Sequence, residues 1–206
     1  MRKFLMAIAL MVAGVNGATA QSNYEYDIWD VIVGGKVGAS ATTLTKLNAD
    51  FQFFPTAAAY AEMYLNKKMS MSLEVSYAHR GGKNIYAKNV PENGPYTYNM
   101  HYINTSYLFK YFPVKRLGVY SGLTLGRMFA AKAKKDHTND IMDELHKGDF
   151  SVPVGLEYTI GEHFTVDARW NWSPRWIAKT NKAKLILGKT RNQAFMLTVG
   201  YKLQVF

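Results

Sequence analysis

The feature that most constrains this chain is a series of segments in which apolar and polar residues alternate. Alternation of this kind predicts β-strands whose two faces meet different surroundings. Eight such segments follow one another, at 30–39, 56–65, 69–78, 102–111, 117–126, 150–160, 164–173 and 195–205. In each, one parity carries Val, Leu, Met, Ala and aromatic residues, and the other carries mostly Gly, Ser, Thr and Asn with isolated charges. The sequence therefore predicts an all-β protein with an even number of antiparallel strands.

The connections between these segments alternate in length. The short ones are 66–68, 113–116 and 161–163, and the long ones are roughly 40–54, 80–100, 129–148 and 175–192. Short turns at one end and long loops at the other are typical of a transmembrane up-and-down barrel with periplasmic turns. Closure of the sheet also removes the free strand edges that a bilayer does not tolerate. We expect an antiparallel β-barrel of about eight strands.

A soluble barrel or sandwich also alternates, but its outward face carries many lysines and glutamates. Here charged residues make up 19% of the chain against 48% hydrophobic residues, and the polar parity is small rather than charged. The apolar parity also places aromatic residues near strand ends, as interfacial girdles do. These residues are Tyr77, Tyr107, Phe109, Tyr111, Phe150, Tyr158, Phe164, Trp170, Trp172 and Tyr201. Both features favour the membrane barrel.

The first twenty residues predict export. Arg2 and Lys3 precede an apolar run from Phe4 to Val15, and Ala18-Thr19-Ala20 is a small-residue cleavage site. The apolar run is too short for a transmembrane helix, which needs about 20 residues. We expect a cleaved signal peptide at 1–20 and one barrel domain at 21–206, located in the bacterial outer membrane.

Two stretches carry a family resemblance. NTSYLFKYFPVKRLGVYSGLTLG and the ending FMLTVGYKL resemble the PorT-like outer-membrane β-barrels of Bacteroidetes-type bacteria, small barrels of the OmpA/OmpX kind. The most specific pieces are 106–126 and 199–203, and the resemblance extends from Trp29 to Phe206. It implies a small single-domain barrel with a structural or binding role. One named member of that family supports secretion of surface proteins, so a secretion role and secretion partners are a further implication.

The inward parity carries enough charge to fill the barrel. Eight strands enclose a space just wide enough for side chains, and unpaired charges in such a space are costly. We expect a lumen charge network of Lys36, Glu62, Glu74, Lys110, Glu157, Asp167 and Arg169. A structural plug of ion pairs is the main interpretation, and a narrow channel or proton path is the alternative.

No enzyme is expected, and no catalytic residue, metal site or cofactor. Cysteine is absent, which excludes thiol chemistry, disulfides and lipid attachment at a cysteine. A lipid-modifying enzyme at the outer rim remains the alternative from another class. It would need a serine within hydrogen-bond reach of a histidine, and Ser76 and Ser106 are the strand serines nearest to His79 and His101. A surface cation site in the loop holding His137 and His146 is a second open alternative, and a helical turn is expected at 140–145.

The chain has a formal net charge of +10, which attracts anionic partners. Export argues against nucleic acid and favours outer-membrane lipid and lipopolysaccharide. The fourth long connection holds only cations among its charged residues, and we expect it to bind anionic lipid; a solubilising loop is the alternative. Its cations are Arg175, Lys179, Lys182, Lys184, Lys189 and Arg191. The aromatic-rich last strand, expected to end near Leu203 or Val205 just before the final residue Phe206, predicts delivery by the barrel-assembly machinery, and the barrel is expected to be a monomer.

Overall fold

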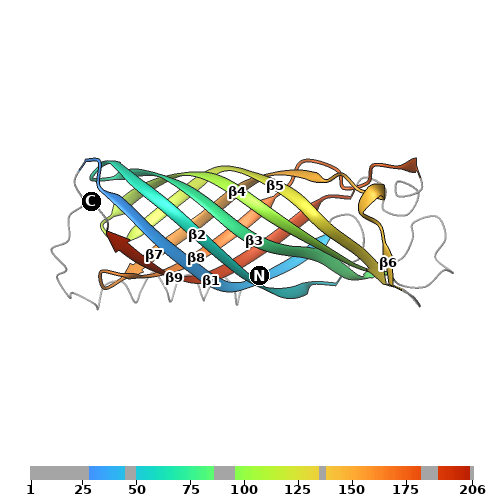
Figure 1. Cartoon of the computed structure of the whole chain (residues 1–206). Coiled ribbons are helices and arrows are strands. Elements are labelled where there is room, and N and C mark those ends of the chain that lie inside the picture. The colour runs from blue at the N-terminus through green and yellow to red at the C-terminus, as the bar shows by residue number, and fades with distance from the viewer. Residues whose placement is uncertain (1–27, 45–49, 86–95, 135–137, 182–189, 205–206) are drawn as a thin grey trace.

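The structure, a computed structural model, describes residues 28–44, 50–85, 96–134, 138–181 and 190–204. The predicted signal peptide and Phe206 lie outside these residues. The described chain forms long tilted strands that wrap around a common axis (Figure 1). The strands are β1 (Val31–Leu44), β2 (Gln52–Asn66), β3 (Met69–Ile85), β4 (Tyr96–Val114), β5 (Leu117–Lys134), β6 (Thr138–Asp140), β7 (Gly148–Ile160), β8 (Phe164–Trp172) and β9 (Asn192–Gln204).

The eight long strands form a closed antiparallel barrel. Each pairs with the next along the chain, β5 continues to β7, and β9 returns to β1. Closure is complete over the length of β1, which pairs with β9 from Ile32↔Gln204 to Leu44↔Asn192. The predicted fold class is therefore confirmed. The short strand β6 was not predicted, and it adds to the outer end of β5 from Lys132↔Asp140 to Lys134↔Thr138.

Side chains alternate between the two sides of the barrel wall as the sequence predicts. Valine, leucine and aromatic side chains of the apolar parity are exposed, among them Val37, Leu123 and Trp170. The other parity is buried in the lumen. Ile32, which breaks the pattern of its segment, faces inward and packs with Tyr64 and Phe112. These three form a small apolar cluster beside the short turns.

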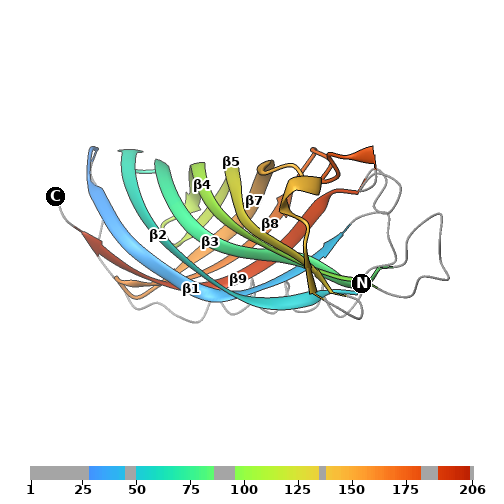
Figure 2. The ribbon, with the colours of Figure 1, turned by 45° about the vertical axis from the view of Figure 1, so that its right-hand side comes forward.

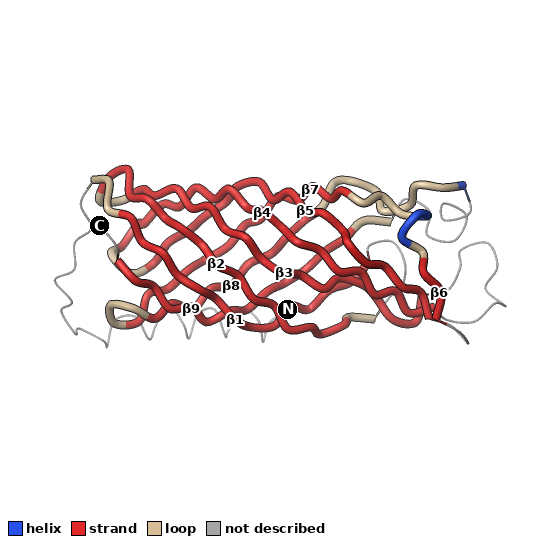
Figure 3. Tube along the Cα trace, in the orientation of Figure 1, coloured by secondary structure: helices blue, strands red, loops and turns tan. Residues whose placement is uncertain are grey.

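The predicted boundaries of three long connections were wrong. Strand continues through 40–44, 52–54, 80–85, 96–100 and 129–134, all of which were expected to be loop. The strands are visible in red over most of the barrel length in Figure 3. The reason is a change of surroundings: above the bilayer the outward face meets water, so an apolar outward parity is no longer required.

In this outer part the inward face carries several large apolar side chains, and some outward positions are charged. Tyr98, Met100 and Met128 face inward and are buried, whereas Lys132 and Lys134 face outward. Apolar side chains from the wall meet the segment after β6, which includes the short 3₁₀ helix η2 (Met142–Glu144). The helical turn predicted at 140–145 is thus confirmed. The interior therefore has a polar layer in the middle of the barrel and a larger apolar cluster toward the outer end.

Two segments, 141–147 and 175–180, pack together at the outer end of the barrel, and we call them the cap. Figure 2 shows the segment with η2 and the segment after β8 at one end of the barrel. They hold each other through a bridge between Leu145 and Ala178 and through the amide of Lys179, which donates to Glu144 O at 3.1 Å. Leu145, Ile177 and Ala178 are buried against the wall. Among the described residues, no helix is both long and apolar enough to cross a bilayer.

Candidate functional site: the lumen and the extracellular rim

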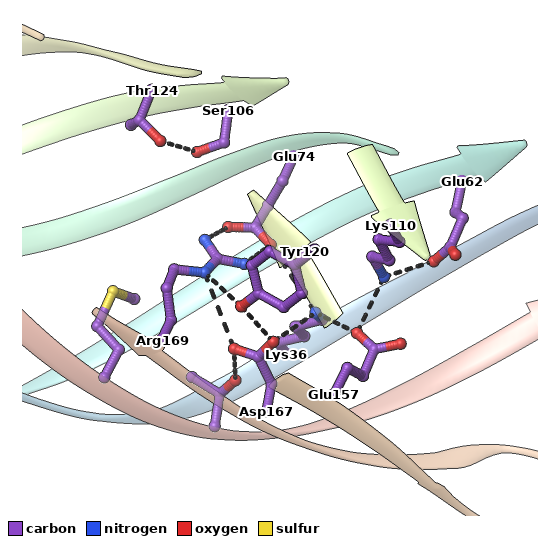
Figure 4. Close-up of polar contacts among 12 residues, drawn as sticks. Lys36, Glu62, Glu74, Ser106, Lys110, Tyr120, Thr124, Glu157, Asp167 and Arg169 are labelled. Atoms are coloured by element: carbon purple, nitrogen blue, oxygen red, sulfur yellow. Dashed lines mark hydrogen bonds and ion pairs between the residues drawn. The ribbon is translucent and has the colours of Figure 1, made fainter. Parts of the chain in front are cut away.

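The structure brings the seven predicted lumen residues into one buried cluster at the middle of the barrel (Figure 4). Each points inward because it has the inward parity of its strand. They come from six strands, so the cluster joins most of the barrel circumference. The residues are Lys36 on β1, Glu62 on β2, Glu74 on β3, Lys110 on β4, Glu157 on β7, and Asp167 and Arg169 on β8.

Glu157 lies between two lysines. Its Oε2 accepts hydrogen bonds from Lys36 Nζ at 2.7 Å and from Lys110 Nζ at 3.0 Å. Lys110 Nζ also donates to Glu62 Oε2 at 2.6 Å, and Glu62 Oε1 accepts from the hydroxyl of Ser70 at 2.5 Å. Lys110 and Glu157 are 0% and 1% exposed. Burial at this level strengthens each ion pair and makes loss of one partner costly.

Arg169 forms the second part of the cluster. Its guanidinium binds Glu74 through two parallel hydrogen bonds of 2.5 and 2.7 Å, the fork geometry that suits arginine and carboxylate. Its Nε donates to the Tyr120 hydroxyl at 2.8 Å, and that hydroxyl donates to Asp167 Oδ2 at 2.5 Å. Asp167 Oδ2 lies 3.6 Å from Lys36 Nζ, which links this part to Glu157.

Two inward tyrosines fill space between the charges, and glycines make room for them. Lys36 Nζ lies 4.9 Å from the Tyr60 ring centroid, and Arg169 lies 5.3 Å from that of Tyr120, close enough for cation–π attraction. A Cβ on Gly34 would lie 2.6 Å from the end of Tyr60, and one on Gly155 would lie 2.4 Å from the end of Tyr120. Larger residues at either glycine would displace the ring.

Sequence reasoning missed one member of this layer. Lys202 on β9 faces the lumen, is 2% exposed, and donates to the Thr159 hydroxyl at 3.0 Å. It shares the inward parity of the last predicted strand, so the signal that selected Lys36 was present for Lys202 as well. With Lys202 included, the cations Lys36, Lys110, Arg169 and Lys202 equal in number the carboxylates Glu62, Glu74, Glu157 and Asp167.

A second buried ion pair lies nearer the outer end. Arg80 on β3 pairs with Asp149 on β7, and Asp149 Oδ2 also accepts from the Ser173 hydroxyl at 3.0 Å. The Arg80 guanidinium lies 5.1 Å from the Tyr102 ring centroid. Sequence reasoning missed this pair because Arg80 was assigned to a loop. The sequence did contain a signal for Arg80: it lies two positions after Ala78 and so continues the inward parity of the predicted third strand.

The predicted anionic-lipid residues are only partly within the described chain. Lys182, Lys184 and Lys189 lie outside it. The other three are at the rim opposite the short turns: Arg175 and Lys179 are exposed, and Arg191 is half-buried. Arg175 Nη2 lies 3.3 Å from His146 Nδ1, to which it donates, and the Arg191 guanidinium lies 5.9 Å from the Trp172 ring centroid.

The structure separates the serines and histidines that a rim enzyme would need. Ser76 and Ser106 are buried in the lumen, and Ser106 bonds to Thr124. His79 and His101 form a cross-strand pair with ring centroids 4.2 Å apart. His101 Nδ1 is 2.7 Å from the hydroxyl of the exposed Tyr77. His137 lies outside the described residues, and within them no group of three or more ligating side chains is placed to hold a metal.

Comparisons with known proteins match this architecture. The family model described as "Outer membrane protein beta-barrel domain" matches residues 6–202. A structure of Ail from Yersinia pestis in complex with the heparin analogue sucrose octasulfate is 14% identical, with a TM-score of 0.53, covering 84% of this chain and 99% of that one. OprG from Pseudomonas aeruginosa is 13% identical, with a TM-score of 0.47, covering 87% and 98%. A search of curated protein sequences gave no match.

The likeness to Ail shows a shared fold and no more, because the identity is low. The family match is stronger, since it spans nearly the whole barrel, from before β1 into β9. The closed eight-stranded architecture, the apolar outward band and the polar lumen agree with it. The chain therefore belongs to the outer membrane protein beta-barrel domain family and is a protein of the bacterial outer membrane.

Proposed function

We propose that this protein is a non-conducting outer-membrane barrel with a structural and binding role, and that its extracellular cationic segment, residues 175–191, holds lipopolysaccharide through its phosphates. The observation that carries the non-conducting, structural part of the proposal is that side chains occupy the lumen at three levels. The apolar cluster of Ile32, Tyr64 and Phe112 lies beside the short turns, the charge network lies in the middle, and the apolar cluster under the cap lies at the outer end.

A lumen filled in this way argues against a channel. An ion entering at the middle would have to displace paired charges, and each paired charge that loses its partner costs several kcal/mol. The apolar cluster between the cap and the wall adds a second barrier. The charge network then serves to hold the strands together, which is a structural role.

The cationic segment supports the binding role. Between Arg175 and Arg191 the sequence holds six cations and no carboxylate, and clustered basic residues at a membrane surface attract anionic head groups. The Ail structure with a polysulfated sugar is a further support, because phosphorylated sugars present similar anionic groups. Delivery by the barrel-assembly machinery and a monomeric state are part of the same proposal.

Lipopolysaccharide binding is the direct test. The triple variant Lys182→Gln, Lys184→Gln, Lys189→Gln removes three charges, and we expect it to bind lipopolysaccharide in detergent micelles at least tenfold more weakly, at about 1 kcal/mol per basic residue. Lys115→Gln, which removes an exposed cation from a periplasmic turn, is the matched control. Equal binding by the triple variant and the parent would contradict the binding role.

Conductance tests the other half of the proposal. The parent barrel in a planar bilayer is expected to show no steady current. A steady current through the parent barrel that disappears when residues of the lumen charge network are replaced would favour the channel alternative. A rim enzyme is the remaining alternative, and a change in lipid A structure in a deletion strain would favour it.

Assistance to secretion is a second candidate, favoured by the PorT-like hairpin at 106–126, which is the β4–β5 hairpin in the structure. Secretion components would then be partners. The test compares the surface and secreted proteomes of a deletion strain and its parent. Selective loss of exported surface proteins with an intact envelope would support this role, and an unchanged proteome would remove it.

A further inference from the structure

Two arginines interrupt the apolar outward face at the outer ends of β5 and β8, Arg127 on β5 and Arg175 just after β8. On β5 the exposed residues Val119, Leu123 and Leu125 are followed by Arg127, which is also exposed. Arg127 lies ten residues beyond Leu117, where β5 begins beside a short turn. At about 3.3 Å per residue and a tilt of about 40°, this is about 25 Å, the height of the apolar band of such barrels. This height places Arg127 near the outer edge of the apolar band, beside the exposed aromatic residue Phe129.

Arg175 approaches the same place from the end of β8. Gly148, the first residue of β7, is the register partner of Arg127 and is exposed. A Cβ on Gly148 would lie 3.4 Å from Arg175 Nη1. Paired residues of neighbouring strands direct their side chains to the same face, about 5 Å apart. Arg127 and Arg175 therefore flank Gly148, which supplies no side chain between them.

No carboxylate compensates these two arginines within the described chain. The carboxylate next to Gly148, that of Asp149, faces the lumen and pairs with Arg80. That of Asp143 pairs with Lys147 at 3.1 Å. The polar partner of Arg175 is the neutral acceptor His146 Nδ1, at 3.3 Å, and Arg127 forms no ion pair with a described residue. Two arginines on either side of one glycine, without a carboxylate partner among the described residues, favour an anion at that place.

A phosphate monoester is the anion that this arrangement fits. Arginine forks bind phosphate oxygens through paired hydrogen bonds. Trp170 and Trp172 lie on the outward face of β8 just below Arg175, and interfacial tryptophans mark the depth of the head groups. A lipid phosphate held at this depth would keep its acyl chains against the apolar strands below it.

We propose that Arg127 and Arg175, with Gly148 as the floor between them, form a binding site for one phosphate of an outer-leaflet glycolipid of the lipid A type. This inference rests on the proposed lipopolysaccharide binding and deepens it. It assigns one phosphate to a defined place on the barrel wall and adds Arg127, which lies outside the cationic segment.

The test measures binding of diphosphoryl lipid A to the refolded full barrel in mixed micelles. Arg127→Gln and Arg175→Gln are each expected to weaken binding about fivefold, the effect of one basic residue at a membrane surface. Gly148→Val keeps every charge but fills the floor, and we expect a similar loss. Lys115→Gln at the opposite rim is the control and should bind as the parent does. Heat-modifiable gel mobility verifies that each variant is folded.

The source of the phosphate is tested with two further probes, lipid A from which the phosphates have been removed and inorganic phosphate alone. We expect the parent to prefer diphosphoryl lipid A to the dephosphorylated form, and the two arginine variants to lose that preference in part. Binding of inorganic phosphate as tight as that of lipid A would overturn the glycolipid assignment.

The outcomes separate this site from the broader proposal. If Arg127→Gln, Arg175→Gln and Gly148→Val bind like the parent while the triple lysine variant does not, the site is wrong and the proposed function stands. If the parent itself does not distinguish phosphorylated from dephosphorylated lipid A, both are wrong.

Discussion

Glu157 shares one carboxylate oxygen between Lys36 and Lys110, and therefore holds together both halves of the lumen network. Lys110 continues to Glu62, and Lys36 continues to Asp167 and the Arg169 part. Replacing such a network with apolar residues can be neutral, but removing one member leaves its partners buried and uncompensated. A single substitution at Glu157 should thus lower the free energy of unfolding by more than the loss of one hydrogen bond would.

We expect Glu157→Gln to lower the free energy of unfolding by about 3–5 kcal/mol, because two buried lysines lose their shared counter-charge. Urea unfolding of the refolded barrel in micelles, followed by tryptophan fluorescence, measures this change. Glu162→Gln in the short turn at 161–163 is the control. Glu162 is exposed, so its change should stay within about 0.5 kcal/mol. Similar losses for the two variants would contradict a stabilising role of the network.

At the scale of elements, β3, β4 and β5 extend further toward the outer end of the barrel than β7 and β8 do. The chain after β6 and after β8 packs against the part of the wall that extends beyond β7 and β8. The Arg80–Asp149 pair ties β3 to the start of β7, and Ser173 joins it at the end of β8. The pair thus lies beneath both cap segments. It is positioned to hold the cap against the tall part of the wall.

Asp149→Asn should loosen the cap without unfolding the barrel. We expect hydrogen exchange to speed up by about tenfold or more at the amides of Ile141, His146, Ile177 and Lys179, since loss of a buried ion pair destabilises locally by more than about 1.4 kcal/mol. These amides hold the cap segments to β5, to each other and to Thr190. Asp143→Asn, which removes an exposed pair in the same segment, is the control. Faster exchange throughout the barrel would show that the pair supports the whole fold rather than the cap.

At the scale of the whole molecule, the short turns and the capped loops lie at opposite ends of one closed sheet. Barrels of this class have short periplasmic turns and longer extracellular connections. The cationic segment and the proposed phosphate site then lie outside the cell, where lipopolysaccharide is found. Both proposals depend on this orientation.

The absence of cysteine from the chain permits a direct test of orientation. Lys179→Cys, in the cap, should react with a membrane-impermeant maleimide on intact cells. Lys115→Cys, in a short turn, should react only after the outer membrane is permeabilised. Both side chains are exposed, so reactivity reports the side of the membrane. Labelling of Lys115→Cys on intact cells would reverse the orientation and exclude both lipopolysaccharide sites.

The sequence by itself determined the strands within the bilayer and the side to which each residue points. Alternation follows directly from the unlike surroundings of a membrane barrel wall, lipid on one side and a polar lumen on the other. Lys36, Glu74 and Arg169 could be assigned to the lumen for this reason alone. Outside the bilayer the wall no longer separates lipid from a polar lumen, so the sequence does not keep the same alternation there. For this reason the extensions of β3, β4 and β5, with Arg80, were predicted as loop.

Only the tertiary structure decided which inward residues meet. Parity gives the face of a residue, but neither its depth nor its neighbours around the barrel, which depend on the register between strands. Lys36 and Glu157 are 121 positions apart in sequence, on strands that are not adjacent, and still form a bond of 2.7 Å. The positions of Arg127 and Arg175 beside Gly148 depend in the same way on the register of β5 and β7 and on the path of the chain after β8, which no local pattern encodes.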